Sequence, residues 1–381
     1  MAPAVNAVPM VDLRAQFAAI EPEIREAIEA VLASQQFVLG PQLAAFEAEM
    51  ARYNGLRTAV GVASGTDALM LGLRACGVGP GDEVIVPTFT FVATAGAVSA
   101  LGGRPVFADI EPETFNVSPA SVESHITERT RAIVAVHFGG LAARAAELQQ
   151  VAAHQGLPLI EDNAQSLGAK LRGRMTGTFG TLSATSFYPS KNLGAYGDAG
   201  MVLTNSEELG ERVRRLRNHG LTAPNLSGEA GCNSRLDELQ AAILRVKLRH
   251  LDQWIERRRE VAALYRQRLA GVADLYLPEA PEGYEHSYYL YTVRIPARGG
   301  EPAERRDRVA RHLARKKIAS AIFYPTPLHL QPLYKSLGGR AGDLPAAEKA
   351  AQEALSLPIY PEMTAEQVDR VAAAVLEALA G

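Results

Sequence analysis

The feature that most constrains the fold is an alternation of short apolar runs with helix-like stretches between about residues 55 and 205. The runs are rich in Val and Ile, and turn residues bound them. They read TAVGVAS, DEVIVP, RPVFADI, RAIVAVH, LPLIED and GMVLT. Such alternation predicts βα units and a mainly parallel sheet with helices on both faces. Because ligands of these sheets bind at the carboxyl ends of the strands, we expect the chemistry where the runs stop.

Helix-like segments flank the alternating region. Residues 21–33 and 41–53 have the apolar spacing of amphipathic helices, and residues 235–270 predict one long helix, straight or bent, that leaves the large domain. The remainder contains the strand candidate YYLYTVRIP, then a helix candidate at 302–317 and a last helix after Pro361. These segments predict a second, smaller α/β unit at the end of the chain.

The length of 381 residues suits two domains better than one small core. We expect an α/β protein with a large domain at residues 1–250 and a smaller C-terminal α/β domain at residues 251–381. The 39 Lys and Arg nearly balance the 42 Asp and Glu, which gives no sign of a nucleic-acid-binding surface.

Cysteine usage and hydropathy indicate the compartment. The two cysteines, Cys76 and Cys232, lack metal-ligand spacing, so we expect neither a disulfide framework nor a metal site. The first ten residues lack the features of a signal peptide, and no run approaches the about 18 apolar residues of a membrane span. We expect a cytoplasmic protein that does not enter a membrane.

A tight turn follows the first apolar run, where Ser64, Gly65, Thr66 and Asp67 lead into ALMLGL. This order predicts a strand, a turn and the start of a helix, whose free N–H groups and dipole suit a phosphate. Gly65 permits a close approach of the ligand. Ordinary capping by Ser64 or Thr66 is the alternative interpretation. We expect Asp67 to point away from the phosphate and to cap backbone.

Two later segments carry ionisable groups in suitable places. LPLIED ends in Glu161 and Asp162, which point to opposite faces of a strand, so at most one of them faces a ligand. A buried Asp needs a cationic partner, and a protonated pyridine nitrogen would supply one. Lys191 lies in SFYPSKNLGAYGDAG among apolar and aromatic residues, where partial desolvation would favour a neutral amine able to form a Schiff base. A solvated strand-end Asp and an exposed Lys are the alternatives.

The motifs SGTDAL, PTFTFVAT, EDNAQSLGA, SFYPSKNLGAYGDAG and NSRLDELQAAIL occur in this order. With them, the chain resembles the DegT/StrS family of sugar aminotransferases from about residue 11 to residue 364. The resemblance implies an aspartate-aminotransferase-like fold with a seven-stranded type of sheet. It also implies that pyridoxal 5'-phosphate is the cofactor.

The resemblance implies a role for each matching residue. Lys191 matches the Schiff-base lysine, and Asp162 matches the partner of the pyridine nitrogen. The other implied cofactor contacts are Gly65, Thr66 and Ser186 at the phosphate, Phe91 on the ring face, Gln165 near the phenolic oxygen, and Asn233 reaching the phosphate from the second subunit. The implied substrate contacts are Tyr188, Arg235, Tyr324 and His329. A core or turn role is the alternative for each of them.

The implied reaction transfers an amino group, usually from glutamate in this family, to a nucleotide-linked keto sugar in a homodimer with shared active sites. Tyr188, where many C4-specific relatives carry His, favours a 3-keto sugar, and a 4-keto sugar is the alternative. A sugar dehydratase of the same fold would carry His in place of Lys191. A regulator that binds the cofactor without catalysis is the remaining alternative, but no helix-turn-helix segment or basic patch supports it.

Overall fold

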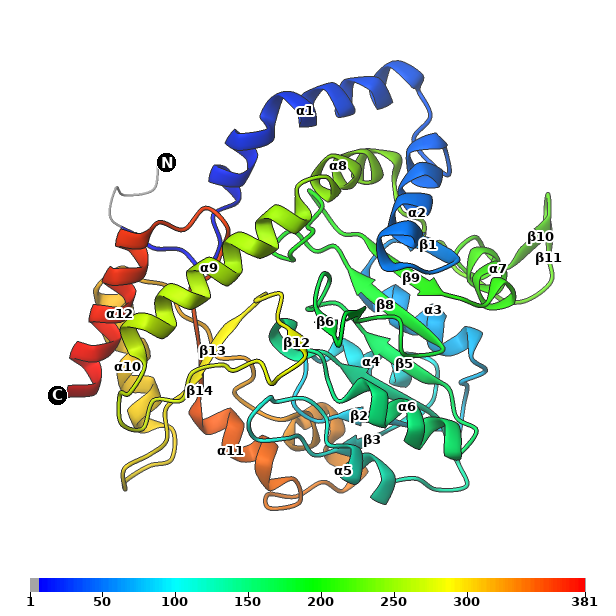
Figure 1. Ribbon diagram of the computed structural model, residues 1–381. Coiled ribbons are helices and arrows are strands. Elements are labelled where there is room, and N and C mark those ends of the chain that lie inside the picture. Colours follow the sequence, from blue (N-terminus) through cyan, green and yellow to red (C-terminus); the bar gives the residue numbers. More distant parts are fainter. Residues whose placement is uncertain (1–6, 381) are drawn as a thin grey trace.

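The computed structural model describes residues 7–380. Residues 1–6 and residue 381 lie outside the described residues. Residues 1–6 belong to the segment in which we expect no signal peptide. A seven-stranded sheet forms the centre of the molecule (Figure 1). Its strands, in spatial order, are β1 (Thr58–Val62), β9 (Gly200–Thr204), β8 (Leu182–Ser186), β5 (Leu159–Asp162), β4 (Thr130–Val136), β2 (Glu83–Pro87) and β3 (Arg104–Ala108). Only β9 runs antiparallel to its neighbours, which confirms the predicted α/β class.

Helices cover both faces of this sheet. They are α3 (Gly65–Ala75), α4 (Ala93–Ala100), α5 (Pro119–Ser124), α6 (Ala145–His154) and α7 (Glu207–Leu216). In β2, Val84 and Val86 face the core that contains α3, α4 and α7, whereas Ile85 faces the core that contains α5 and α6. Both faces are therefore apolar, which explains why this strand reads as a continuous apolar run.

Strand β8 is the one strand of the sheet that the apolar pattern does not mark. Its sequence, LSATS, alternates apolar and hydroxylated residues, yet Leu182 to Thr185 are all buried. The strand lies between β9 and β5, where both edges are paired. Its position in the middle of the sheet, and not its hydropathy, makes it a core strand.

The flanking helices differ in their bounds from the prediction. Helix α1 (Leu13–Ser34) begins earlier than expected, because the Asp12 side chain accepts hydrogen bonds from the backbone of Arg14 and Ala15. Helix α2 spans Pro41–Asn54. In Figure 1, α1 (dark blue) extends along the edge of the molecule next to α8.

The long helix predicted at residues 235–270, straight or bent, is divided into two helices. The segment forms α8 (Glu238–Leu248) and α9 (Leu251–Leu269), which are separated at Arg249 and His250. Helix α8 packs on α1 and α2, whereas α9 packs on the C-terminal α12. The break therefore lies where the chain passes from one packing environment to the other, and the domain boundary at residue 250 stays a prediction.

The last part of the chain surrounds a separate core (Figure 1). Strand β13 (Tyr291–Arg294) pairs with β14 (Ala354–Leu357), and α10 (Glu304–Arg315) and α12 (Ala365–Ala380) pack beside them with α9. The remaining elements are α11 (Pro345–Glu353), the short strands β6 (Lys170–Leu171), β7 (Arg174–Met175), β10 (Leu221–Ala223), β11 (Leu226–Ser227) and β12 (Tyr284–Glu285), and the 3-10 turns η1 (Phe138–Gly140), η2 (Leu328–Leu330) and η3 (Pro332–Leu337).

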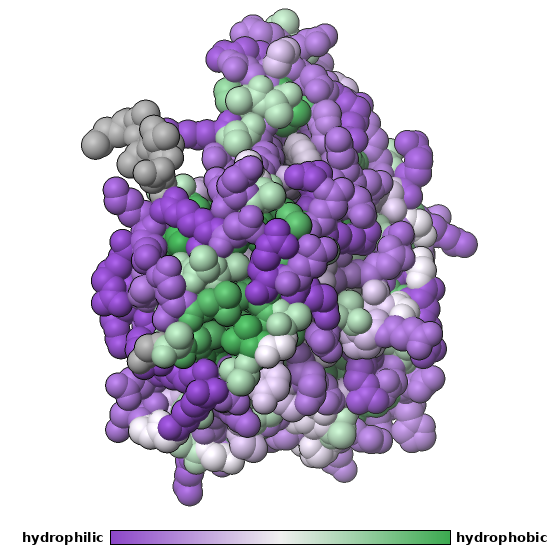
Figure 2. Space-filling view, turned by 60° about the vertical axis from the view of Figure 1, so that its left-hand side comes forward, coloured by the Kyte–Doolittle hydropathy of each residue, from purple (hydrophilic) through white to green (hydrophobic). Residues whose placement is uncertain are grey.

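Hydrophilic side chains cover most of the face in Figure 2, with apolar ones gathered in a patch on it. Within residues 7–380, no helix combines the length and the hydropathy that a membrane crossing requires. Cys76 and Cys232 are both free thiols. The described residues contain no group of three or more His, Cys, Asp or Glu side chains placed to hold a metal ion.

Candidate active site

A cavity of about 570 Å³ opens at the carboxyl ends of β1, β2, β5 and β8. Loops that follow these strands supply one side of it, and Tyr289, Leu290, Phe323 and Tyr324 supply the other. The predicted residues that line the cavity are Gly65, Thr66, Phe91, Asp162, Gln165, Ser186, Tyr188, Lys191 and Tyr324. The fold thus brings together residues that are up to 259 positions apart in the chain, from Gly65 to Tyr324.

Lys191 occupies a short loop that closes on itself. Its backbone N–H donates to the carbonyl of Tyr188 at 2.8 Å, and the N–H of Ala195 donates to the carbonyl of Phe187 at 2.8 Å. The Lys191 Nζ lies 4.3 Å from the ring centroid of Tyr289. These bonds hold the amine at the wall of the cavity.

Tyr289 is a site residue that the sequence reasoning missed. Burial raises its pKa, but the charge of Lys191 and hydrogen bonds with Ser190 and Lys191 outweigh burial, so the pKa of Tyr289 is lowered overall. The phenol therefore interacts directly with the amine that the motif predicts to react. Its segment, HSYYLYTV, carries no local signal of this contact, because the contact depends on how the chain returns to the sheet.

Asp162 and Glu161 face opposite sides of β5, as predicted for neighbours on a strand. Asp162 is buried at the cavity, where its carboxylate accepts from Thr94 Oγ1 at 2.9 Å and from the N–H of Ala164 at 3.2 Å. Burial raises the pKa of Asp162, and this effect exceeds the lowering by the two hydrogen bonds and by the charge of Lys191. A carboxylate in this state would be stabilised by a further cation in the cavity.

Glu161 is bonded within the protein core, outside the cavity. Its carboxylate accepts from the N–H groups of Gly177 at 2.8 Å and Gly180 at 2.6 Å, and from His137 Nε2 at 2.9 Å. The Nδ1 atom of His137 accepts in turn from the N–H of Ala143 at 3.0 Å. This network joins the loop after β7 to the end of β4, which is a structural role.

The first turn of α3 lies against the end of β8. Ser64 caps the helix, since its hydroxyl accepts from the N–H of Asp67 at 3.1 Å. A Cβ atom at Gly65 would lie 2.5 Å from the Cβ of Ser186, so a larger residue would separate the helix from the strand. This turn therefore has both features: Ser64 caps the helix, and the turn also lines the cavity.

The expectation for Asp67 needs a correction. Asp67 does not line the cavity, as expected, but its carboxylate caps no backbone group of residues 7–380 and instead accepts from the hydroxyl of Ser234 at 2.7 Å. The bond ties the first turn of α3 to the segment that precedes α8. The sequence could not indicate this partner, which lies 167 positions away.

The cavity has the shape and chemistry that the predicted cofactor requires. Phe91 and Tyr188 line it with 57% and 55% of their surfaces exposed, which leaves two aromatic rings free to contact a planar ligand. The buried Asp162 suits a protonated ring nitrogen, and the start of α3 beside Ser186 suits a phosphate. Gln165 accepts from the N–H of Gly139 at 2.8 Å and donates to the Tyr324 hydroxyl at 3.1 Å.

Three predicted residues do not line this cavity. Asn233 is exposed and pairs with Asn218, whose side-chain oxygen also accepts from Arg235 Nη1 at 3.3 Å. His329 is buried between Thr88 and Glu348, with its Nδ1 2.8 Å from Thr88 Oγ1 and its Nε2 3.2 Å from Glu348 Oε1. Within one chain these are structural contacts, and the predicted ligand contacts of the three residues stay predictions.

Comparisons with known proteins agree with this geometry. Residues 18–376 match the DegT/DnrJ/EryC1/StrS aminotransferase family. The chain is 46% identical to a protein of Geobacillus stearothermophilus named as a pleiotropic regulatory protein, over 97% of this chain and 98% of that one. It is also 46% identical to a UDP-N-acetyl-3-dehydro-alpha-D-glucosamine 3-aminotransferase of Acidithiobacillus ferrooxidans, over 99% of each chain.

Solved structures give the same result. The crystal structure of DesV from S. venezuelae, in complex with a ketimine intermediate, superposes with a TM-score of 0.93 and 44% identity, over 98% of each chain. Two other similar structures, at 30% and 25% identity, are described with PMP, the amine form of pyridoxal phosphate. The chain therefore belongs to the DegT/DnrJ/EryC1/StrS aminotransferase family, and pyridoxal phosphate is its cofactor.

Proposed function

We propose that this enzyme transfers the amino group of glutamate to the C3 keto carbon of a nucleotide-linked sugar. The observation that carries the proposal is the placement of Lys191 in one cavity with the buried Asp162 and two exposed aromatic rings. The relative from Acidithiobacillus ferrooxidans, which is named for amination at C3 of a nucleotide-linked sugar, supports the substrate class.

The residues present fit each part of pyridoxal phosphate. Gly65, Thr66 and Ser186 would hold the phosphate, and Asp162 would hold the ring nitrogen. When bound, the cofactor supplies an aldehyde that condenses with amines and a ring that accepts electron density. Asp162 supports this role because a carboxylate buried beside the nitrogen keeps that nitrogen protonated.

Lys191 would hold and move the proton of the reaction. Its Nζ lies over the Tyr289 ring, at the wall of the cavity that the substrate would enter. An amine at this place can take a proton from the substrate carbon and can deliver it to the carbon of the cofactor. Tyr289 limits where the amine can lie, since the ring face attracts its protonated form.

Tyr188 supports amination at C3. Its side chain is 55% exposed at the cavity, three positions before Lys191, so it can contact the sugar. Tyr324 lines the same cavity and is the second candidate for a sugar contact. The 4-keto sugar remains the competing substrate, and a product analysis separates the two.

The enzyme would act as a homodimer with shared active sites. Exposed apolar residues between α1 and α2 support an interface there: Phe37, Val38 and Leu39 have 40%, 46% and 42% of their surfaces exposed. Asn233 and Arg235 would then serve the cavity of the second subunit. The two free thiols support a reducing, cytoplasmic location.

The test is incubation of the loaded enzyme with glutamate and a panel of nucleotide-linked 3-keto and 4-keto sugars. A product mass that reports exchange of the keto oxygen for an amine identifies the substrate, and NMR identifies the aminated carbon. We expect amination of a 3-keto sugar. Amination of 4-keto sugars alone would contradict the C3 assignment, and no amination of any sugar would favour the regulatory role for which one relative is named.

A further inference from the structure

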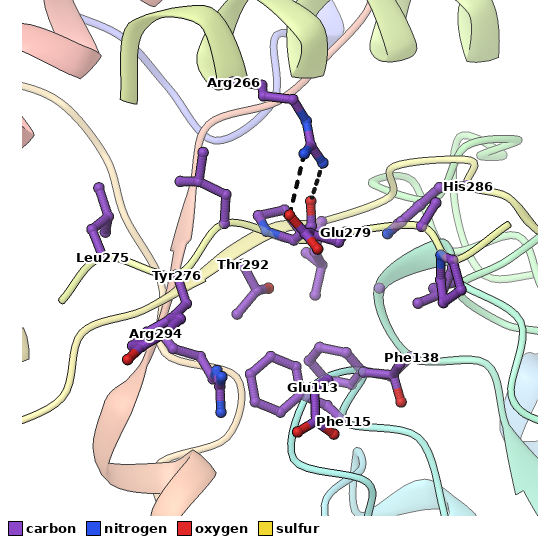
Figure 3. Close-up of a pocket in the computed structure, with 18 of the residues that line it drawn as sticks. Glu113, Phe115, Phe138, Arg266, Leu275, Tyr276, Glu279, His286, Thr292 and Arg294 are labelled. Atoms are coloured by element: carbon purple, nitrogen blue, oxygen red, sulfur yellow. Dashed lines mark hydrogen bonds and ion pairs between the residues drawn. The ribbon is translucent and has the colours of Figure 1, made fainter. Parts of the chain in front are cut away.

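A second cavity, of about 580 Å³, lies beside the active-site cavity (Figure 3). Its walls come from the loop before α5, from η1, from the end of α9 with the loop that follows, and from β13. Within the described part of the chain, Leu290 is the one residue that lines both cavities. The volume falls in the range of about 300 to 1,000 Å³ that is usual for sites of small molecules.

The wall of this cavity is mainly apolar and aromatic. Phe115 and Phe138 meet edge to face with ring centroids 5.3 Å apart, and Leu275, Leu277 and Leu290 continue the apolar surface. Figure 3 shows the two phenylalanines on the side of the group away from Arg266. Such a wall would bury the apolar body of a ligand and exclude a strongly hydrated one.

His286 places an unused hydrogen-bond donor at this wall. It is only 6% exposed, and its ring stacks on Tyr288 at 4.0 Å. The N–H of Tyr288 donates to Nδ1 at 2.8 Å, so the ring proton is on Nε2. Burial, and then the charge of Arg259, lower the pKa of His286 to about 3, which keeps the ring neutral. Nε2 has no hydrogen-bond partner among residues 7–380, so it is available to donate to a ligand in the cavity.

Arg294 supplies an unpaired cation. Its guanidinium lies 4.9 Å from the ring centroid of Tyr276 and makes no ion pair or side-chain hydrogen bond with any residue that the structure describes. Glu353 forms its ion pair with Lys349, at 3.8 Å, and the charge of Arg294 acts on the same carboxylate without forming an ion pair. The other arginine of the cavity, Arg266, is already bound to Glu279 at 3.3 Å. Figure 3 shows Arg294 and His286 on opposite sides of the cavity.

We propose that this second cavity binds a small organic acid with one carboxylate and an apolar body. The carboxylate accepts from Arg294, the body packs on Phe115 and Phe138, and His286 donates to a further oxygen of the ligand. A single charge is specified because Arg294 is the one unpaired cation among the described residues that line the cavity and because Glu113, which also lines it, repels a second negative group. This inference does not depend on the substrate proposed above.

The ligand would contact the segment that positions an active-site residue. His286 and Leu290 line the second cavity, while Tyr289, between them in sequence, lies under Lys191 in the active-site cavity. Asn192, next to Lys191, also donates to the carbonyl of Ser287 at 3.3 Å. The two cavities are therefore connected through one short stretch of backbone.

The test is isothermal titration of the cofactor-loaded, full-length enzyme with 3-phenylpropanoate and with its uncharged amide, 3-phenylpropanamide. We expect saturable binding of the acid and at least about tenfold weaker binding of the amide, since hydrogen bonds to a charged group are the stronger ones. Arg294→Met should weaken binding of the acid by a similar factor, and His286→Phe should weaken it by several-fold. Arg174→Met, which removes another arginine that lies over an aromatic ring, at 4.1 Å from Phe179, should leave the affinity unchanged.

A cavity-filling variant keeps the test decisive if Arg294→Met does not fold. Leu277→Trp retains Arg294 and His286 but occupies the apolar wall, so it should abolish binding while aminotransferase turnover and the thermal midpoint stay near wild type. The proposal is overturned if no saturable binding occurs up to about 10 mM, if acid and amide bind equally, or if both variants fold and retain the wild-type affinity.

Discussion

Two lysines lie at the loop between β8 and β9, one within it and one packed against it, and the ammonium group of each lies over a tyrosine ring. Lys191 belongs to the loop and lines the active-site cavity, with its Nζ 4.3 Å from the Tyr289 ring centroid. Lys247, on α8, has no exposed surface. Its Nζ lies 4.2 Å from the Tyr196 ring centroid and donates to the Gly194 carbonyl at 2.7 Å.

The difference between these lysines is access. Burial lowers the pKa of Lys247 to about 8, with Glu362 acting in the opposite direction, so its amine is easily neutralised. A neutral amine is the form that reacts with carbonyls, yet Lys247 does not line the cavity and is bonded to the loop. Burial alone therefore does not make a lysine reactive, and Lys247 instead fixes the loop that carries Lys191.

The largest expected effect is that of Lys191→Ala. We expect turnover to fall by at least about 10³-fold, because the variant loses both the cofactor linkage and the group that moves the proton. The fold should persist, which circular dichroism and a thermal melt would check. Wild-type turnover in this variant would refute the assignment of the active site.

Asp162→Asn should have the next largest effect. An amide cannot hold a proton on the ring nitrogen, so both half-reactions should slow by about 10²-fold in stopped-flow measurements. Glu161→Gln is the matched control on the other face of β5. It should reduce stability by about 1 to 3 kcal/mol, through its bonds to Gly177, Gly180 and His137, and change turnover little. Equal losses of turnover in both variants would contradict the assignment of faces.

Mixed dimers test whether Asn233 serves the second subunit. When inactive Lys191→Ala and Asn233→Ala chains exchange freely, half of the dimers are hybrids with one intact site each. We therefore expect recovery of about a quarter of the wild-type turnover. Absence of recovery, with exchange demonstrated by native mass spectrometry and both parents inactive, would argue against shared sites.

Lys247→Met should have the smallest effect on turnover and a measurable effect on the pH dependence of stability. Because the pKa of Lys247 is lower in the folded chain, at about 8, than its ordinary 10.5, the unfolded chain binds more protons between these values. The free energy of unfolding of the wild type should therefore gain up to about 3 kcal/mol from this group as the pH rises through that interval. Urea unfolding should show this gain in the wild type and not in Lys247→Met, and parallel pH profiles would contradict it.

The sequence predicted the sheet well because buried parallel strands carry continuous apolar runs, as in β2. Strand β8 escaped because its hydroxylated residues conceal its burial. The break between α8 and α9 escaped because Arg249 and His250 are ordinary helix residues, and only the change of packing partner separates the two helices.

Within the site, the residues that local motifs mark could be predicted, whereas contacts between residues far apart in the chain could not. Gly65, Asp162 and Lys191 lie in local motifs that follow strands, where strand ends alone indicate a ligand. Thr94 ends the motif PTFTFVAT, but nothing in that motif indicates its bond to Asp162, and Tyr289 belongs to no motif. Only the folded chain places these two residues beside Asp162 and Lys191. His286 and Arg294 belong to a cavity that no sequence pattern marks.

The central claim is that the cofactor is carried by Lys191 and not by Lys247, although the ammonium group of each lies over a tyrosine ring. Borohydride reduction of the loaded enzyme would fix the cofactor to its lysine, and peptide mass spectrometry would then locate the added mass. We predict that the mass lies on the peptide that contains Lys191 and that prior incubation with glutamate removes it. Attachment at Lys247, or attachment that glutamate leaves unchanged, would contradict the account.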